Sequence, residues 1–456
     1  MSDEHDTPVR FDAALTAVLA LLRDWPPAAD PGLGAIVLVR DVYGMFRLVF
    51  EFRPSDDVLA SLSPSLEQAA GAFLAQPGGR FLFKEDLFAP EAIFESPDRT
   101  YPFGEDALFS FIDRGITGVD WLRSAPLPNE APTPTRCVFF GLKGGVGRST
   151  ALAILAHALS RRGKRVLVLD MDLESPGLSS SMLPMVEGAF PVHGIVDWFV
   201  EEAVGQVDRR FLRDMAGISP LSSNADILVV PAFGWNEDQD YLAKLSRTYL
   251  DIPSLDGTTR TFASRLAAMI DALEREFAPH VVLIDTRAGM HDISAVTLTR
   301  LGARTLLFAM DTDQTWRGYQ LLFSHWRYPP RINDIREGAG RGQMKMVAAA
   351  IPQTEAPEAY LADFARRACD LWQATLYEEI PPQDDPAFDP GRDYFNYDEG
   401  DAEAPHFPIP IYWHGAYTLF DLMNSRRSQA QLADANINGA FGRFIAETLA
   451  WLEVDS

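Results

Sequence analysis

Cysteine is scarce in this sequence, and long apolar runs are missing. Only Cys137 and Cys369 occur among 456 residues, and they do not form a CxxC pair. Two cysteines cannot build a disulfide framework or a four-cysteine metal site, so an iron–sulfur or zinc centre has little support. No uninterrupted apolar run approaches the ~18 residues of a membrane span, and the acidic start MSDEHD lacks the apolar core of a secretory signal. We therefore expect a cytoplasmic protein.

Positive charge is also in short supply. The chain has 40 Lys and Arg residues against 64 Asp and Glu residues, which gives a formal net charge of −24 at pH 7. This balance disfavours a whole-surface nucleic-acid binder, although a local basic patch is compatible with it. Apolar residues make up 47% of the chain and charged residues 23%, which excludes wholesale disorder. The length predicts two or three domains.

A proline-rich stretch divides the chain. Residues 124–135 (SAPLPNEAPTPT) hold four prolines without periodicity, which is typical of a linker. The sequence before it, residues 1–123, predicts a small α+β accessory domain, and we expect this domain to recognise a protein partner. Its expected elements are helices at 11–24 and 64–76 and a hairpin over 35–52 with its turn at Asp41–Gly44.

After the linker, short apolar strands alternate with helices over residues 136–456. Strands this apolar belong to a sheet whose two faces are both covered, and the alternation predicts an α/β domain with a mostly parallel, doubly wound sheet. An acidic insertion at about 378–405 interrupts the pattern, and we interpret it as a solvated loop. Strands are expected at 137–140, 165–170, 227–231, 281–285, 305–310 and 345–351, and helices at 149–162, 192–205, 260–277, 292–302, 314–326, 356–378 and 436–452.

The strongest motif, GLKGGVGRST, follows the first of these strands and opens a helix. Glycines let the backbone turn so that its N–H groups point at phosphate oxygens, and the N-terminus of the next helix adds positive potential. Ser149 stands where a hydroxyl ligates Mg²⁺. The motif therefore predicts a nucleotide-binding loop made by Lys143, Gly144, Gly145, Val146, Gly147, Arg148, Ser149 and Thr150.

KGGVGRST resembles the deviant Walker A motif of the ParA/MinD family of P-loop ATPases. Two later segments match the same family: VLVLDMDLESPGL resembles its switch I segment, and VVLIDTRAG resembles its Walker B and switch II segments. The motifs occur in the family's order, and the resemblance covers about residues 134–456. It implies a P-loop NTPase fold that binds ATP with Mg²⁺ and hydrolyses it slowly as a nucleotide-sandwich homodimer.

The resemblance also implies roles for single residues. Lys143 matches the signature lysine that reaches the ATP of the other subunit, and Asp172 matches the aspartate that positions or activates the attacking water. Asp285 matches the Walker B carboxylate that holds Mg²⁺ through water. Gly289 lets switch II approach the γ-phosphate.

Asp170 and Asp285 each end an apolar strand. Carboxylates at the carboxyl ends of parallel strands converge where such sheets bind their ligands, so we expect these two residues to form the Mg²⁺ site together with Ser149. The alternative for each aspartate is a helix N-cap.

Arg148 departs from the family pattern, which has a lysine at this position. Its forked guanidinium still binds phosphate, so nucleotide binding is expected to survive, and Arg148 joins Lys143 and Asp172 as a candidate catalytic residue. Efficient hydrolysis is what the substitution puts in question. Residues 347–355 also lack the asparagine with which the family often reads adenine, so the choice of ATP rests on the resemblance.

The sequence thus predicts an ATP hydrolase that acts as a nucleotide-gated dimeric switch and controls a partner. Two alternatives stay open: a catalytically weak nucleotide-binding scaffold within a multi-protein system, and a ParA-like DNA-associated ATPase. The basic runs 161–165 and 426–427 would serve DNA binding, but the first also caps a helix C-terminus, and the net charge disfavours it. The last helix ends in Glu453 and Asp455, unlike a basic membrane-binding helix.

Overall fold

Two units, Met1–Ala125 and Pro126–Ser456, make up the computed structural model of the chain. Most of the expected linker at 124–135 lies outside the described residues, and Thr135 already belongs to a strand. None of the helices in the described part of the chain combines the length and the hydropathy needed to cross a membrane. The structure describes residues 8–25, 31–96, 98–103, 107–122, 134–224, 226–235, 240–253, 259–327, 331–337, 342–353, 356–421, 423 and 425–454.

The N-terminal unit is built on a four-stranded sheet with the order β3-β2-β1-β4. β1 and β2 form the expected antiparallel hairpin, while β4 pairs with β1 and β3 with β2 in parallel. In the hairpin turn, Asp41 Oδ1 accepts hydrogen bonds from the N–H groups of Tyr43 and Met45, both at 3.0 Å. The elements are α1 (Phe11–Arg23), β1 (Ile36–Arg40), β2 (Phe46–Phe50), α2 (Asp56–Ala70), α3 (Pro77–Arg80), β3 (Phe81–Phe83), α4 (Glu91–Phe94), β4 (Phe109–Asp113) and α5 (Val119–Leu122).

α2 differs from the helix expected at 64–76, because it begins about two turns earlier and ends at Ala70. Two aspartates occupy its first turn, where their charge favours a helix start, and Pro64 lies inside the helix. Leu62 and Leu66 are buried in the core that α2 shares with α1 and the sheet. The burial of this apolar face offsets the cost of an internal proline.

The C-terminal unit contains an eight-stranded sheet with the order β14-β13-β12-β5-β11-β6-β8-β7. All neighbours are parallel except β7 and β8, which confirms the expected mostly parallel α/β sheet. The strands are β5 (Thr135–Gly141), β6 (Val166–Met171), β7 (Gly217–Ile218), β8 (Ile227–Val230), β11 (Val281–Thr286), β12 (Arg304–Ala309), β13 (Met344–Ile351) and β14 (Ile409–Tyr412), besides a separate pair, β9 (Ile252–Pro253) and β10 (Thr259–Arg260).

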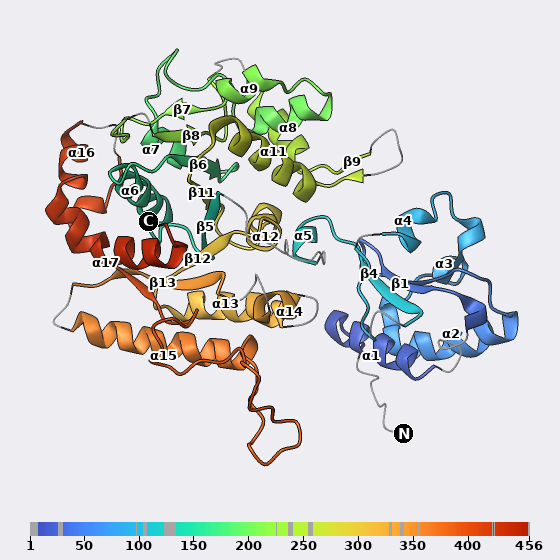
Figure 1. Cartoon of the computed structure of the whole chain (residues 1–456). Coiled ribbons are helices and arrows are strands. Elements are labelled where there is room, and N and C mark those ends of the chain that lie inside the picture. The colour runs from blue at the N-terminus through green and yellow to red at the C-terminus, as the bar shows by residue number, and fades with distance from the viewer. Residues whose placement is uncertain are drawn as a thin grey trace. The chain divides into compact units, whose positions relative to one another are not determined.

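Helices cover both faces of this sheet (Figure 1). α6 and α17 share one core with apolar side chains of seven strands. On the opposite face, Arg136 of β5 bonds Glu274 of α11, and Tyr319 of α13 donates to the carbonyl of Phe308 at 2.8 Å. The helices are α6 (Arg148–Ser160), α7 (Leu178–Met182), α8 (Ile195–Ala203), α9 (Arg209–Asp214), α10 (Tyr241–Thr248), α11 (Phe262–Phe277), α12 (Asp292–Thr299), α13 (Asp313–Trp326), α14 (Arg331–Arg336), α15 (Pro357–Thr375), α16 (Ser425–Gln431) and α17 (Asp434–Leu452).

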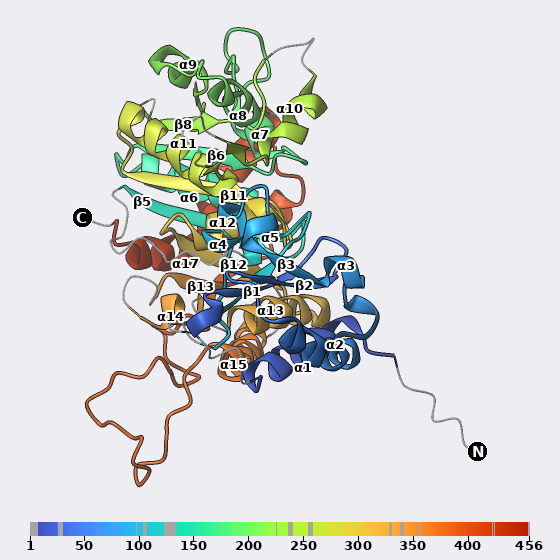
Figure 2. The same ribbon diagram turned by 90° about the vertical axis from the view of Figure 1, so that its right-hand side faces the viewer.

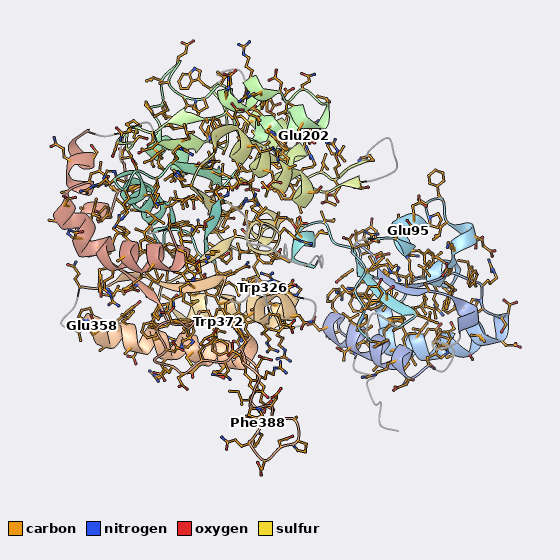
Figure 3. The ribbon with its side chains drawn as sticks, viewed as in Figure 1. Glu95, Glu202, Trp326, Glu358, Trp372 and Phe388 are labelled. Atoms are coloured by element: carbon orange, nitrogen blue, oxygen red, sulfur yellow. The ribbon has the colours of Figure 1, made fainter. Side chains whose placement is uncertain are left out.

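The segment after α15 leaves the helical layer as a projecting loop in both views (Figures 1 and 2), and this loop carries Phe388 (Figure 3). Within the helical layer, Trp326 of α13 and Trp372 of α15 are buried, and both rings pack against Phe323. The chain then returns to the sheet as β14, which pairs with β13 in parallel. The sequence pattern did not predict this strand.

Arg136 predicts unequal effects for its two acidic partners. Its Nε and Nη2 bond the Glu274 carboxylate, both at 2.7 Å, and Nη2 also lies 2.6 Å from Asp271. The side chains of Arg136 and Glu274 are 8% and 9% exposed, whereas Asp271 is 48% exposed. We expect Glu274→Ala to lower the free energy of unfolding by about 3–5 kcal/mol, because a buried guanidinium loses its main partner, and Asp271→Ala by less than about 1 kcal/mol. Urea unfolding followed by tryptophan fluorescence measures both, and equal losses would contradict this ranking.

Candidate functional site

The loop between β5 and α6 forms an open cradle at the carboxyl edge of the sheet. Gly145 and Gly147 adopt φ of +75° and +83°, a left-handed conformation that favours glycine. A Cβ added at Gly144, Gly145 or Gly147 would meet no atom within 4 Å, while Val146 is buried and anchors the loop in the core. Within the described residues, no side chain caps the N-terminus of α6. The N–H groups of its first turn are therefore available to an anion.

Ser149 and Asp285 are brought together directly. Ser149 Oγ donates a 2.5 Å hydrogen bond to Asp285 Oδ2, which joins the first turn of α6 to the end of β11. Asp285 is 2% exposed, and its Oδ1 has no hydrogen-bond partner among the described residues. Burial raises the pKa of Asp285 to about 6, against the opposing charge of Arg148 and the Ser149 hydrogen bond. Such a buried, unpartnered carboxylate oxygen favours a cation nearby.

Asp170 lies beside Asp285 because β6 and β11 pair in register at these two residues. Asp170 is fully buried, and its Oδ2 accepts hydrogen bonds from N and Oγ of Ser179 at 2.9 and 2.5 Å. Burial, followed by the charge of Asp285, raises the pKa of Asp170 to about 7. Asp172 follows on the loop after β6, and burial raises its pKa as well. In the described part of the chain, Oδ1 of both Asp170 and Asp172 lacks a hydrogen-bond partner.

These donors fit Mg²⁺ that is bound together with a nucleotide. Mg²⁺ keeps several waters and usually takes one or two carboxylates besides phosphate oxygens. Ser149 and Asp285 supply a hydroxyl and a carboxylate beside the cradle, whereas Asp170 has Ser179 as its partner. The described residues hold no group of three or more His, Cys, Asp or Glu side chains placed to bind a metal by themselves. Phosphate and water oxygens would therefore complete the coordination.

The two basic residues of the loop are placed differently. Lys143 is exposed, whereas Arg148 is only 7% exposed and donates from Nη1 to the backbone carbonyl of Thr286. The sequence predicts an Arg148 that faces phosphate, but this Nη1 is turned to the backbone that follows Asp285. From there, the guanidinium charge opposes the rise in the pKa of both Asp172 and Asp285.

Gly289 brings the loop after β11 against the cradle. Its N–H donates to the carbonyl of Gly141 at 3.0 Å, and its φ is +91°. Thr150 is half-buried in the first turn of α6. Of the residues predicted for the site, those that converge on this edge are Arg148, Ser149, Thr150, Asp170, Asp172, Asp285 and Gly289, while Lys143 lies exposed on the loop.

A second set of polar side chains lies at this edge, and none of them was predicted from the motifs. Arg287 Nη1 lies 2.7 Å from Glu174 Oε2, and Tyr249 Oη donates to Glu174 Oε1 at 2.7 Å. Glu174 and Arg287 each stand two residues after an aspartate that the motifs single out, Asp172 and Asp285. That shared offset is the signal in the sequence that could have found them.

The site residues described above all lie within the part of the chain that matches one known protein family. Residues 137–322 match the family described as the CobQ/CobB/MinD/ParA nucleotide binding domain. An iron–sulfur cluster carrier protein from Pseudomonas fragi is 31% identical over 167 residues, which make up 35% of this chain and 55% of that protein. The chain thus spans about half the length of this curated relative.

Two solved structures are similar at low sequence identity. The ParA family ATPase from Chlorobium tepidum TLS is 11% identical, with a TM-score of 0.43 over 69% of this chain and 99% of that chain. The septum site-determining protein MinD from Pyrococcus horikoshii OT3, complexed with Mg-ADP, is 18% identical, with a TM-score of 0.29 over 41% of this chain and 63% of that chain. The matched family model covers residues 137–322, so this part of the chain is a nucleotide-binding domain of the CobQ/CobB/MinD/ParA type.

Proposed function

We propose that the protein binds ATP with Mg²⁺ at the cradle and hydrolyses it slowly as a homodimeric switch. The N-terminal unit recognises the protein partner that the switch controls. The observation that carries the proposal is the 2.5 Å hydrogen bond between Ser149 and Asp285 at an open glycine cradle. Both the hydroxyl and the unpartnered carboxylate oxygen stand where a nucleotide-bound cation needs donors.

Each residue then has a distinct task. The N–H groups of the loop and of α6 hold the phosphates, and Lys143 reaches those of the second subunit. Ser149 and Asp285 hold Mg²⁺, which when bound neutralises charge on the phosphate oxygens. Asp172 orients the attacking water, and Gly289 leaves room for the γ-phosphate. Phosphoryl transfer needs little beyond this positioning and charge neutralisation.

A nucleotide-gated scaffold with little turnover is the second candidate. The observation that favours it is the hydrogen bond from Arg148 to the carbonyl of Thr286. A guanidinium held by the protein backbone has one donor fewer for the charge that develops during phosphoryl transfer. Binding survives in this candidate, because the glycine cradle and the N-terminus of α6 still hold the phosphates and Arg148 keeps its charge beside them.

DNA binding finds less support than nucleotide binding. In the basic run 161–165, Arg161 lies 2.6 Å from Asp434, and Arg165 donates to the carbonyl of Ala278 at 2.6 and 2.9 Å. These arginines already have partners within the chain, and a protein that binds DNA nonspecifically needs them for phosphates.

Cluster carrying, the role in the name of the Pseudomonas fragi relative, also lacks its ligands here. Cys137 and Cys369 are the chain's two cysteines, and both are buried, one in β5 and the other in α15. Burial raises the pKa of the Cys137 thiol, which disfavours the thiolate that a cluster binds.

Loss of the Ser149 hydroxyl should weaken ATP binding in the presence of Mg²⁺. We expect Ser149→Ala to raise the Kd of Mg-ATP about tenfold, because one charge-assisted ligand is lost, while Ser149→Thr keeps the affinity. The matched control is Ser160→Ala, since Ser160 at the other end of α6 donates an equally short 2.5 Å hydrogen bond to Asp226. Calorimetric titration compares the three variants with the parent. Unchanged affinity in Ser149→Ala would remove Ser149 from the site.

Lys143→Ala should abolish ATP-driven dimerisation while binding of ATP to the monomer partly persists. Lys143 is exposed, so the substitution leaves the core intact and removes only a charge that reaches the second subunit. Sedimentation with a slowly hydrolysed ATP analogue and Mg²⁺ measures the dimer fraction. Arg162→Ala, which removes a positive charge at the far end of α6, is the control. A dimer fraction equal to that of the parent would overturn the role of Lys143.

Arg148 decides between the enzyme and the scaffold. We expect Arg148→Ala to weaken ATP binding by roughly ten- to a hundred-fold, or ~1.5–3 kcal/mol, because a buried cation is lost beside the phosphates and the carboxylates. Arg148→Lys should keep the affinity and keep or raise turnover, since lysine retains the charge. Phosphate release beside calorimetry measures both. Turnover in Arg148→Lys but not in the parent would favour the scaffold, and turnover in the parent alone would make the arginine a catalytic adaptation.

A further inference from the structure

An ion pair ties together the two loops that carry the proposed catalytic groups. Glu174 lies on the loop after β6, and Arg287 lies on the loop after β11. Because β6 and β11 are parallel neighbours, both loops leave the sheet at the same edge. Arg287 Nη1 and Glu174 Oε2 are 2.7 Å apart, and the two side chains are only 28% and 26% exposed. A pair this shielded is screened less than an ordinary surface pair.

The two oxygens of the Glu174 carboxylate have different partners: Oε2 forms the ion pair with Arg287 but accepts no hydrogen bond among the described residues. Oε1 accepts the 2.7 Å hydrogen bond from Tyr249, which follows the end of α10. At the other end of the same helix, Tyr241 Oη donates to the carbonyl of Leu173. α10 therefore holds one side of the loop after β6, and Arg287 holds the other.

The same contacts extend to the cradle. Arg148 opens α6 and bonds the carbonyl of Thr286, the residue before Arg287. Arg148 thus links the cradle to the loop after β11, and Arg287 links the loop after β11 to the loop after β6. Four carboxylates crowd this edge, and the guanidinium charges of Arg148 and Arg287 both lower the pKa of Asp172 against its burial. The charge of Arg287 therefore offsets part of the repulsion among these carboxylates.

We propose that Arg287 is a positioning residue, which holds the loop after β6 through Glu174 so that Asp172 stays beside Asp285 when a nucleotide is bound. This inference rests on the proposed ATP hydrolysis. It extends that function, because it gives the two loops a common restraint that couples a movement of one to the other. Arg287 touches no reacting atom in this role.

The test compares Arg287→Ala and Arg287→Lys with a matched control in the full-length protein. Arg304→Ala is that control, because Arg304 forms an ion pair of the same 2.7 Å length with Glu453 and its side chain is 26% exposed. Arg304 starts β12 and so lies at the opposite edge of the sheet. Hydrogen exchange of the backbone amides of residues 172–178 is measured without nucleotide and with Mg²⁺ and a slowly hydrolysed ATP analogue, and steady-state kcat and KM for ATP are measured beside it.

We expect Arg287→Ala to speed exchange at 172–178 about tenfold and to lower kcat about tenfold or more, with KM within about threefold of the parent, because a misplaced group costs turnover rather than binding. Arg287→Lys should recover part of both effects, and Arg304→Ala should match the parent. Exchange at 172–178 that stays unchanged in Arg287→Ala overturns the proposal. So does a loss of kcat no larger than that of Arg304→Ala.

The exchange measurement separates this inference from the proposed function. If the parent binds ATP but releases no phosphate, the proposed hydrolysis fails, and with it the catalytic consequence of Arg287. The restraint on the loop is still decided in that case by exchange in the nucleotide-free protein. If the parent turns over and Arg287→Ala does so equally well, the hydrolysis stands and the positioning role falls.

Discussion

The register between β6 and β11 sets Asp170 directly beside Asp285, and most of this site follows from that pairing. Two carboxylates buried at neighbouring strand ends repel one another and lack water, which is why burial holds the pKa of both above the ordinary aspartate value. The Ser149 hydroxyl, the charge of Arg148 and two hydrogen-bond donors of Ser179 offset part of the free energy lost by burying these carboxylates. A cation bound with a nucleotide would supply what these donors leave unmet. The strand pairing that brings the two carboxylates together therefore also lowers the local stability of the fold.

Much of the C-terminal fold could be predicted, because strands covered on both faces are short apolar runs and helices fill the intervals. β5, β6 and β11 are buried along nearly their whole length. Each therefore appears in the sequence as an uninterrupted apolar run that can be recognised as a strand. β14 could not be found this way. It has four residues, includes Pro410 and follows a long acidic loop, so its place in the sheet depends on β13 rather than on its own pattern.

The candidate site was predictable as a set of residues but not as a set of contacts. Gly147, Ser149 and Asp285 are recognisable because a phosphate loop and a strand-end carboxylate have fixed local surroundings. The orientation of the Arg148 guanidinium could not be predicted in this way, because it depends on where the carbonyl of Thr286 lies. Glu174 and Arg287 are far apart in the sequence and meet only through the parallel register of two strands. In the sequence, only their shared offset of two residues from Asp172 and Asp285 relates them.

The position of β5 in the sheet has a consequence for the synthesis of the chain. β5 lies between β11 and β12, both of which come much later in the sequence. At a synthesis rate of about 5–20 residues per second, β11 and β12 emerge from the ribosome on the order of ten seconds after β5. Both edges of β5 stay unpaired during that time. During that interval the cradle has no Asp285 beside it. The candidate site is therefore incomplete until most of the C-terminal unit has left the exit tunnel, and in that interval the unpaired edges of the apolar central strand are prone to aggregation.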